Sequence, residues 1–241
     1  MEIVPVIDLK GGQVVHARGG ARDAYRAIES SLTTDSGPLA VVEALLRLHP
    51  FTSLYVADLD AIEGRSGHDA QLESLRAAFP DLHLWVDNGL SSEVDCRAWL
   101  ARGLGDLVIG SESQEDAGLL GALSDASGRL LLSLDFKGET FLGPPDLQND
   151  PNHWPPRVIA MTLARVGGQR GPDLDRLRSL VAHAPGHRVF AAGGVRGLAD
   201  LECLARIGAA GALVASALHD RRITGAQLRA FEASAIPNRP G

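Results

Sequence analysis

Short apolar runs alternate with amphipathic segments along the whole chain. Eight of these runs are almost continuously hydrophobic, which is the pattern of parallel strands buried on both faces. They cover residues 3–8, 53–58, 83–87, 106–109, 129–135, 157–162, 188–192 and 212–215. We therefore predict eight buried parallel strands.

The segments between these strands have the marks of helices. Segment 39–48 follows Pro38, which favours a first helical turn, and its leucines and valines fall on one face. Segment 91–103 begins with a serine cap and acids and ends at a glycine. Segments 171–183 and 197–208 have the same character. Eight strand–helix alternations in 241 residues favour a (β/α)8 TIM barrel, and we predict one such domain over the whole chain.

One segment departs from the alternation. Residues 138–156, "GETFLGPPDLQNDPNHWPP", contain five prolines together with Asn and Asp. These residue types interrupt helices and favour turns. We expect a long loop here in place of a fifth helix.

The two halves of the chain resemble each other. "ARGLGDLVIGS" (101–111) recurs as "ARIGAAGALVAS" (205–216), and "WVDNGLSS" (85–92) corresponds to "FAAGGVRG" (190–197). A constant offset of 105 positions relates Gly89, Gly103, Val108 and Ser111 to Gly194, Gly208, Leu213 and Ser216. The repeat predicts a barrel of two related half-barrels. Chance similarity between two strand–helix units is the alternative explanation.

Acidic residues stand where several strands end, which is the active-site face of such a barrel. Asp8 and Asp135 end the first strand of each half and share an apolar–Asp–Leu/Phe–Lys–Gly setting. One charged and one protonated carboxyl are suited to moving protons on a sugar carbon and its ring oxygen. Strand-end acids also cap loops or pair with lysines, but the symmetric pair favours catalysis. The residues expected near this rim are Asp8, Asp58, Asp60, Asp87, Asp135 and Thr162.

Glycine turns at the same strand ends indicate anion binding. "AAGGVRG" (191–197) and "VASALHD" (214–220) each follow a strand and open a helix. Backbone N–H groups at such turns hold phosphate in many barrels. For a single turn of this kind, a plain tight turn is the commoner explanation, whereas two matched pairs favour a substrate with a phosphate at each end. The candidate phosphate-binding positions are Gly193, Gly194, Val195, Ala215 and Ser216, with Gly89, Gly110 and Ser111 as the symmetric set.

Composition narrows the possible partners. Hydrophobic residues make up 45% of the chain, the net charge is −7, and no basic run is present, which argues against nucleic acid. No apolar run approaches the roughly 20 residues that span a bilayer, and no signal segment precedes the first strand. Cys96 and Cys203 form neither a disulfide framework nor a metal cluster. We expect a cytoplasmic monomer or weak homo-oligomer that binds a phosphorylated small molecule.

Several motifs in order give the chain a family resemblance. They are "VPVIDLKGGQVV" (4–15), "YVADLDAIEG" (55–64), "LSLDFKG" (132–138), "RGPDLD" (170–175), "AAGGVRGLADLECL" (191–204) and "LVASALHD" (213–220). Through them the chain resembles the half-barrel-repeat enzymes of histidine biosynthesis. It is most similar to the phosphoribosylformimino-aminoimidazole-carboxamide ribotide isomerases; the cyclase subunit of imidazole glycerol phosphate synthase shares their fold.

The resemblance implies an Amadori aldose-to-ketose rearrangement of a phosphorylated aminosugar, with the histidine-pathway ribotide as one candidate substrate. It implies that Asp8 is the base and Asp135 the acid. It also implies that the glycine turns hold two phosphates, and that no metal or organic cofactor is required.

The chain departs from the isomerase pattern at three places. The sixth-strand motif, roughly Thr-Asp-Ile-x-x-Asp-Gly-Thr, is here "MTLARVGGQRG". Val166 then stands where the family has an aspartate. Met161 aligns with the first threonine of the motif, and Thr162 can take the role of that threonine only if the alignment is shifted by one residue. The third-strand motif Gly-Gly-Gly-Ile-Arg is "DNGLS", and His16 takes an arginine position. A valine cannot bind a hydroxyl, so a substrate contact is lost at position 166.

The first loop, "RGGARDAYRAIES" (18–30), and "ARVG" in the sixth strand region are similar to a divergent subgroup of this family. That subgroup occurs with genes for one-carbon carriers, methanopterin or methanofuran. The similarity makes Arg18, Arg22, Tyr25 and Arg26 candidate substrate contacts, a solvated charged loop being the alternative. Two other functions remain open. One is a different reaction on a phosphorylated metabolite of carrier biosynthesis, and the other is a non-catalytic phosphate-ligand binder or partner subunit.

Overall fold

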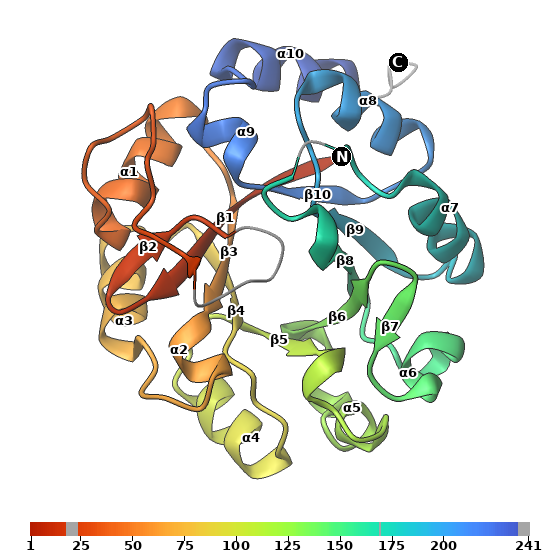
Figure 1. Cartoon of the computed structure of the whole chain (residues 1–241). Helices are drawn as coiled ribbons and strands as arrows, with labels where there is room; N and C mark the ends of the chain where they lie inside the picture. Colours follow the sequence, from red (N-terminus) through yellow and green to blue (C-terminus); the bar gives the residue numbers. More distant parts are fainter. Residues whose placement is uncertain (18–23, 169, 236–241) are drawn as a thin grey trace, which may run out of the picture.

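Eight parallel strands close into a barrel (Figure 1). The computed structural model describes residues 1–17, 24–168 and 170–235. Hydrogen bonding follows the order β1–β3–β4–β5–β6–β8–β9–β10, and β10 pairs with β1 to complete the ring. The strands are β1 (Glu2–Lys10), β3 (Ser53–Asp58), β4 (His83–Asp87), β5 (Asp106–Gly110), β6 (Leu130–Lys137), β8 (Arg157–Thr162), β9 (Arg188–Ala192) and β10 (Gly211–Val214). The predicted (β/α)8 barrel is confirmed.

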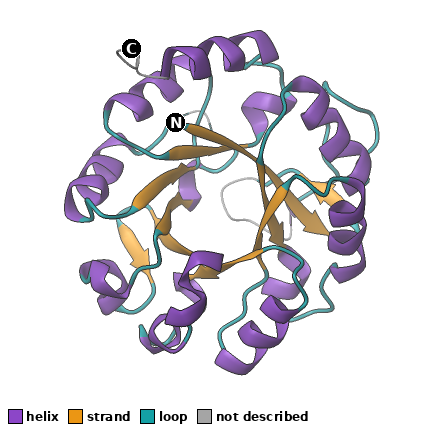
Figure 2. Ribbon diagram, turned by 180° about the vertical axis from the view of Figure 1, so that it is seen from behind, coloured by secondary structure: helices purple, strands orange, loops and turns teal. Residues whose placement is uncertain are grey.

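Helices surround the strands, as the view from behind shows (Figure 2). The four helices expected from the sequence are confirmed as α1, α4, α7 and α8. Within the described residues, no helix combines the length and hydrophobicity that crossing a membrane requires. The helices are α1 (Pro38–Leu48), α2 (Leu59–Ile62), α3 (Asp69–Ala78), α4 (Glu93–Ala101), α5 (Gly118–Ala122), α6 (Pro145–Asn149), α7 (Leu174–His183), α8 (Leu198–Arg206), α9 (Ser216–His219) and α10 (Gly225–Ala235).

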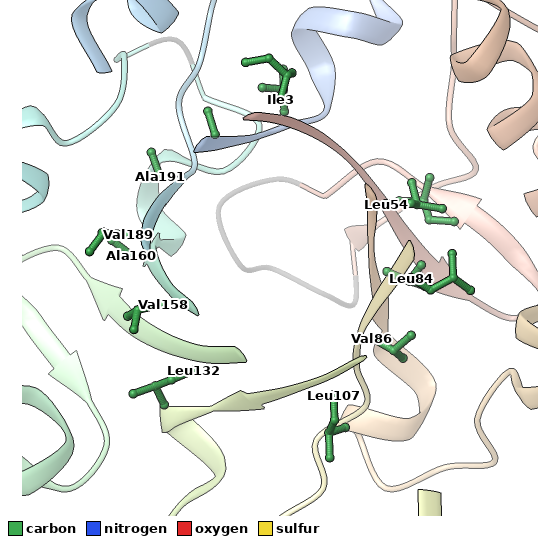
Figure 3. Packing of buried hydrophobic residues seen from close by; sticks show 14 of the residues in the cluster. Ile3, Leu54, Leu84, Val86, Leu107, Leu132, Val158, Ala160, Val189 and Ala191 are labelled. Atoms are coloured by element: carbon green, nitrogen blue, oxygen red, sulfur yellow. The ribbon is translucent and has the colours of Figure 1, made fainter. Parts of the chain in front are cut away.

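Side chains alternate between the two faces of every strand and so form two apolar layers. One layer points outward and packs against the helices (Figure 3). The other fills the barrel centre and includes Val4, Tyr55, Trp85, Val108, Leu131, Ile159, Phe190 and Leu213. In that inner layer the rings of Trp85 and Phe190 meet edge to face, 5.0 Å apart. The same alternation decides which strand-end side chains reach the centre of the barrel.

The structure repeats as the sequence does. Strand β9 begins 105 positions after β4, and helix α8 runs over the positions that correspond to α4. The first strand of each half continues into an antiparallel hairpin with β2 (Gln13–Val15) or β7 (Thr140–Leu142). In these hairpins Asp8 lies opposite Val15, and Asp135 lies opposite Leu142. The prediction of two related half-barrels is confirmed.

The expectation of a long loop over 138–156 is wrong in part. The segment contains β7, the short helix α6 and a 3₁₀ turn at Pro151–His153. The prolines do not prevent these helices, because Pro145 and Pro151 stand in first turns, where no backbone N–H is needed. Leu147 is fully buried, and its carbonyl accepts the indole N–H of Trp154 at 2.7 Å. Side-chain packing therefore orders a segment whose composition suggests a loop.

Truncating the inner layer is expected to destabilise the barrel. Phe190→Ala removes a fully buried ring and is expected to lower the free energy of unfolding by about 3–5 kcal/mol. Urea denaturation followed by circular dichroism measures the change. The control Val94→Ala alters a side chain that is 78% exposed and is expected to change stability by less than about 0.5 kcal/mol. Equal midpoints for the two variants would contradict the inner-layer assignment.

Candidate active site

A cavity of about 330 Å³ opens at the C-terminal ends of the barrel strands. Barrels of this kind hold their active sites at this face. The described residues that line it include four carboxyl groups, but Lys137 is their only lysine, and no arginine is among them. The carboxyl groups are Asp8, Asp87, Glu112 and Asp135. Among the described residues that line the cavity, carboxyl groups therefore outnumber lysine and arginine side chains.

Asp8 and Asp135, the predicted catalytic pair, both line this cavity. Asp8 is on β1, where its neighbours in register are Val15 and Ala57. Asp135 is on β6, opposite Met161 of β8. Because the two aspartates occupy equivalent positions in the two half-barrels, the symmetry of the fold places both at the same end of the barrel.

Asp135 is 5% exposed and accepts several hydrogen bonds. Its Oδ1 accepts the Ser133 hydroxyl at 2.7 Å, and its Oδ2 accepts the Glu112 N–H at 3.3 Å. Burial is the main reason why the pKa of Asp135 is raised to about 7, and the charges of Asp87 and Glu112 add to it. The two hydrogen bonds act in the opposite direction. Near neutral pH this carboxyl is therefore able to donate a proton.

Asp87 is a third carboxyl at the centre of the site. It ends β4 and accepts the hydroxyl of Tyr55 at 3.1 Å. Burial, followed by the charges of Asp87, Asp135 and Asp8, raises the pKa of Tyr55 well above its usual value, so the phenol stays protonated. Asp87 was expected from the sequence to lie near the rim but was not assigned a catalytic or binding role. Its place in "DNGLS", where the family has glycine, was the available signal.

Gly110 lies on β5, between the strands that carry Asp87 and Asp135. A Cβ at this position would lie 3.4 Å from Oδ2 of Asp135 and 3.8 Å from Oδ2 of Asp87, which are ordinary van der Waals contacts. Gly110 does not itself line the cavity. The structure places this candidate phosphate-binding position next to the two acids.

The glycine turns of the second half open onto the cavity. Gly193, Gly194, Val195, Ala215 and Ser216 all line it. Gly194 has a φ of +86°, and a Cβ there would lie 2.3 Å from the Gly171 carbonyl oxygen, so only glycine fits. His16, in the segment after β2, also lines the cavity, and its Nε2 is 3.3 Å from the Ser216 hydroxyl.

The matching candidate positions of the first half, Gly89, Gly110 and Ser111, do not line the cavity. Ser111 is fully buried, and its hydroxyl donates to the Leu142 carbonyl at 2.6 Å. Gly143 packs so closely that a Cβ there would lie 2.7 Å from the Ser111 carbonyl oxygen. A Cβ at Gly89 would likewise lie 2.9 Å from Ile62. Of the two symmetric sets of candidate phosphate-binding positions, the structure therefore brings only the second to the cavity.

Thr162, the third predicted catalytic residue, lies outside the cavity. Side chains alternate along β8, and Ile159 and Met161 face inward, so Thr162 faces the helix layer, where it is 4% exposed. Met161 takes the cavity position. Val166 also lines the cavity, so the family's aspartate position lies at the site but carries no carboxyl.

Asp58 and Asp60, expected near the rim, anchor the β1–β2 turn instead. Asp58 accepts the backbone N–H of His68 at 2.6 Å and lies 2.8 Å from its Nδ1. Asp60 accepts the Gly11 N–H at 2.8 Å, and Nε2 of His68 accepts the Gly12 N–H at 2.8 Å. For these two acids the structure supports the loop-capping alternative.

The four candidate substrate contacts of the first loop differ in their position relative to the cavity. Tyr25 lines the cavity, whereas Arg26 is exposed and donates to the Tyr25 carbonyl at 3.2 Å. Arg18 and Arg22 lie outside the described residues. Across the described segments, no group of three or more His, Cys, Asp or Glu residues is arranged to hold a metal ion.

His219 is a cavity residue that sequence reasoning missed. It ends α9 and is 3% exposed, and its Nδ1 lies 3.0 Å from the Ser30 hydroxyl. Burial and the nearby His16 lower its pKa to about 4, so the ring is neutral at physiological pH. His219 lies in "VASALHD", the segment after the last barrel strand, and nothing in that sequence pattern indicates that its ring lines the cavity.

Comparison with known proteins identifies relatives of this chain. The family described as "Histidine biosynthesis protein" matches residues 2–224. An uncharacterised protein of Methanocaldococcus jannaschii is 28% identical over 224 residues, 91% of this chain and 93% of that protein. Two relatives are named 1-(5-phosphoribosyl)-5-((5-phosphoribosylamino)methylideneamino) imidazole-4-carboxamide isomerase. The Myxococcus xanthus protein is 29% identical, covering 92% of this chain and 95% of its own. The Haloarcula marismortui protein is 31% identical, covering 92% and 93%.

The electrostatic coupling between Asp87 and Asp135 can be measured directly. Asp87→Asn removes a negative charge, and we expect the pKa of Asp135 to fall from about 7 toward its ordinary value. Titration of carboxyl ¹³C signals by NMR follows this change. In the control Asp175→Asn, which alters a carboxyl that is 96% exposed, the pKa of Asp135 should stay as in the parent protein. An unchanged pKa in Asp87→Asn would exclude the coupling.

Proposed function

The chain belongs to the histidine biosynthesis protein family, and we propose that it is an aldose–ketose isomerase acting on a phosphorylated aminosugar. Isomerases among its relatives support the reaction class. The observation that carries the proposal is the pair of aspartates at equivalent strand ends, Asp8 and Asp135, in one cavity. Burial keeps Asp135 partly protonated near neutral pH, as an acid catalyst requires.

The proposed reaction moves protons and leaves the overall composition of the substrate unchanged. Asp135 donates a proton to the ring oxygen, the C1–O bond breaks, and an iminium forms between C1 and the amine nitrogen. Asp8 then removes the proton on C2 to give an enolamine. Asp8 returns the proton to C1, and the C2 hydroxyl loses its proton to the deprotonated Asp135, so that the C2 carbonyl forms and both carboxyls regain their starting states. Two groups of opposite protonation state suffice for these steps.

The phosphate of the substrate is assigned to the second-half turns. Gly193, Gly194 and Ser216 line the cavity beside His16, and binding there would hold the sugar in a fixed orientation toward the two aspartates. The histidine-pathway ribotide is one candidate substrate. The other candidate is a different phosphorylated metabolite, such as an intermediate in the biosynthesis of a one-carbon carrier. Val166 favours this second candidate, because it stands where the family has a carboxylate.

Removing either aspartate is expected to abolish most of the activity. We expect Asp8→Asn and Asp135→Asn each to reduce turnover by about 10²–10⁴-fold, the usual contribution of general acid–base catalysis. Turnover is measured on the histidine-pathway ribotide and on a panel of phosphorylated aldosylamines, with circular dichroism to verify folding. Asp175→Asn serves as the control and should retain full turnover. Full activity in both active-site variants would exclude the acid–base roles.

The pH profile should report the protonation of Asp135. As a general acid it acts only when protonated, so kcat/KM is expected to decline above its pKa of about 7 by about tenfold per pH unit. In Asp87→Asn the decline should begin at lower pH, because the raised pKa depends partly on that charge. A kcat/KM that stays constant well above pH 7 would rule out Asp135 as the acid.

A further inference from the structure

Two buried serines contact Asp135 from neighbouring strands. Ser133 precedes it by two positions on β6, so both side chains point to the same face of the strand. Ser111 follows β5, which pairs with β6. Both serines are 0% exposed, so water does not compete with Asp135 for their hydroxyl groups. The way in which these hydroxyls use their protons therefore bears directly on the ionisation of Asp135.

Ser133 serves one oxygen of the carboxyl group. Its hydroxyl donates to Oδ1 of Asp135 at 2.7 Å. The carbonyl oxygen of a protonated carboxyl can accept such a bond, and so can either oxygen of an ionised carboxylate. Oδ1 can therefore keep Ser133 as its donor in both protonation states. Because the bond is stronger when the acceptor is charged, it lowers the pKa of Asp135 and partly opposes the effect of burial.

Ser111 has more contacts than a single hydroxyl proton can serve. Its Oγ accepts the Asp135 N–H at 2.9 Å. The same Oγ is 2.6 Å from the Leu142 carbonyl oxygen and 3.2 Å from Oδ2 of Asp135. A hydroxyl has one proton to donate and two lone pairs, and the carbonyl, which can only accept, takes that proton at the shorter distance. The contact with Oδ2 is then a hydrogen bond only when Oδ2 carries the carboxyl proton and donates it to Ser111.

We propose that Ser133 and Ser111 are positioning residues for Asp135: Ser133 keeps Oδ1 as an acceptor, and Ser111 receives the proton on Oδ2. Oδ2 also accepts the Glu112 N–H at 3.3 Å, so both of its contacts are long and therefore weak. A proton held by weak contacts is available for transfer. The inference rests on the proposed function in taking Asp135 as the acid, and it goes further by assigning the proton to one oxygen.

The charged surroundings of Asp135 stay the same when a serine is replaced. Strands β7 and β8 contribute only the apolar Leu142 and Met161 to the described cavity lining. Because serine is neutral, its replacement by alanine removes a hydroxyl and no charge. A change in the pKa of Asp135 then reports the lost hydroxyl. The ionisable lining residues on the surrounding elements β1, β3, β4, the turn after β5 and β6 are Asp8, Tyr55, Asp87, Glu112 and Lys137.

Replacing the two serines should move the pKa of Asp135 in opposite directions. Ser133→Ala removes a bond that favours the ionised form, so we expect the pKa to rise from about 7 by about one to two pH units. Ser111→Ala removes the acceptor of the carboxyl proton, so the pKa should fall by about half a pH unit to one pH unit. Titration of carboxyl ¹³C signals by NMR measures both values. A purely structural role would admit water and lower the pKa in both variants. Shifts in the same direction, or no shift in either variant, would overturn the proposal.

Two further variants control for packing. Ser133→Thr keeps a hydroxyl at the same strand position and should hold the pKa of Asp135 near its parent value. Ser53→Ala removes another buried hydroxyl, which donates to Oε1 of Glu2 at 2.7 Å from the first position of β3. We expect no change in the pKa of Asp135 in that variant. A rise as large as in Ser133→Ala would contradict the assignment of the effect to the Ser133 hydroxyl.

A measurement on the unaltered chain covers variants that fail to fold. The ¹³Cβ signal of Ser133 should titrate with the same midpoint as Asp135, because the hydrogen bond between them strengthens when the carboxyl ionises. The ¹³Cβ signal of Ser53 should stay constant over that pH range. A Ser133 signal that also stays constant there would remove Ser133 from its proposed role.

The pH dependence of turnover gives a separate readout. If Asp135 is the acid, the decline of kcat/KM at high pH should begin at higher pH in Ser133→Ala and at lower pH in Ser111→Ala, following the pKa in each variant. The NMR titrations need no substrate. Opposite pKa shifts in a chain that isomerises no aldosylamine would therefore contradict the proposed function and leave the roles of the two serines standing.

Discussion

The alternation of side chains around a closed parallel barrel is the constraint on which the rest of the structure depends. Pairing of β10 with β1 closes the ring and fixes the register of every strand. A shift of one residue in any strand would exchange its inner and outer faces. That register directs Asp8, Asp87 and Asp135 to the cavity and turns Thr162, one position past Met161, toward the helices. Strand register therefore decides which of these side chains face the cavity.

The acids at one end of the barrel have hydrogen-bond partners in the surrounding strands. The Tyr55 hydroxyl bonds to Asp87 from within the inner layer, and the Ser133 hydroxyl bonds to Asp135. Close carboxyls in a buried site cannot all ionise easily, and the group with the strongest burial takes up a proton. In this cavity that group is Asp135, which is 5% exposed and lies next to two other acids. Burial of Asp135, with a smaller contribution from the neighbouring acids, is thus the physical origin of its raised pKa.

Strand positions and the half-barrel repeat followed from the sequence, because hydrophobic periodicity and a constant offset are local signals. The cavity's detailed lining did not. Thr162 was chosen by a motif comparison with a one-residue slip, which ignores strand alternation, and the structure places Met161 in the cavity lining instead. Ser111 was chosen for its symmetry with Ser216, but its hydroxyl is used by the Leu142 carbonyl, a contact across 31 positions. His219 was missed because its burial beside Ser30 depends on residues 189 positions apart.

The two half-barrels have equivalent backbones but have diverged in the chemistry of their turns. At the offset of 105 positions, Asp87 and Asn88 stand where the other half has Ala192 and Gly193. In the two hairpins, His16 follows Val15 and Gly143 follows the corresponding Leu142. Gly143 packs closely on Ser111, whereas the His16 ring lies near the Ser216 hydroxyl. The glycines and serine of the second-half turns therefore line the cavity, whereas their first-half counterparts do not, so the two ends of the cavity differ. A barrel with identical halves would bind a two-ended substrate in either orientation, whereas this asymmetry favours one orientation relative to Asp8 and Asp135.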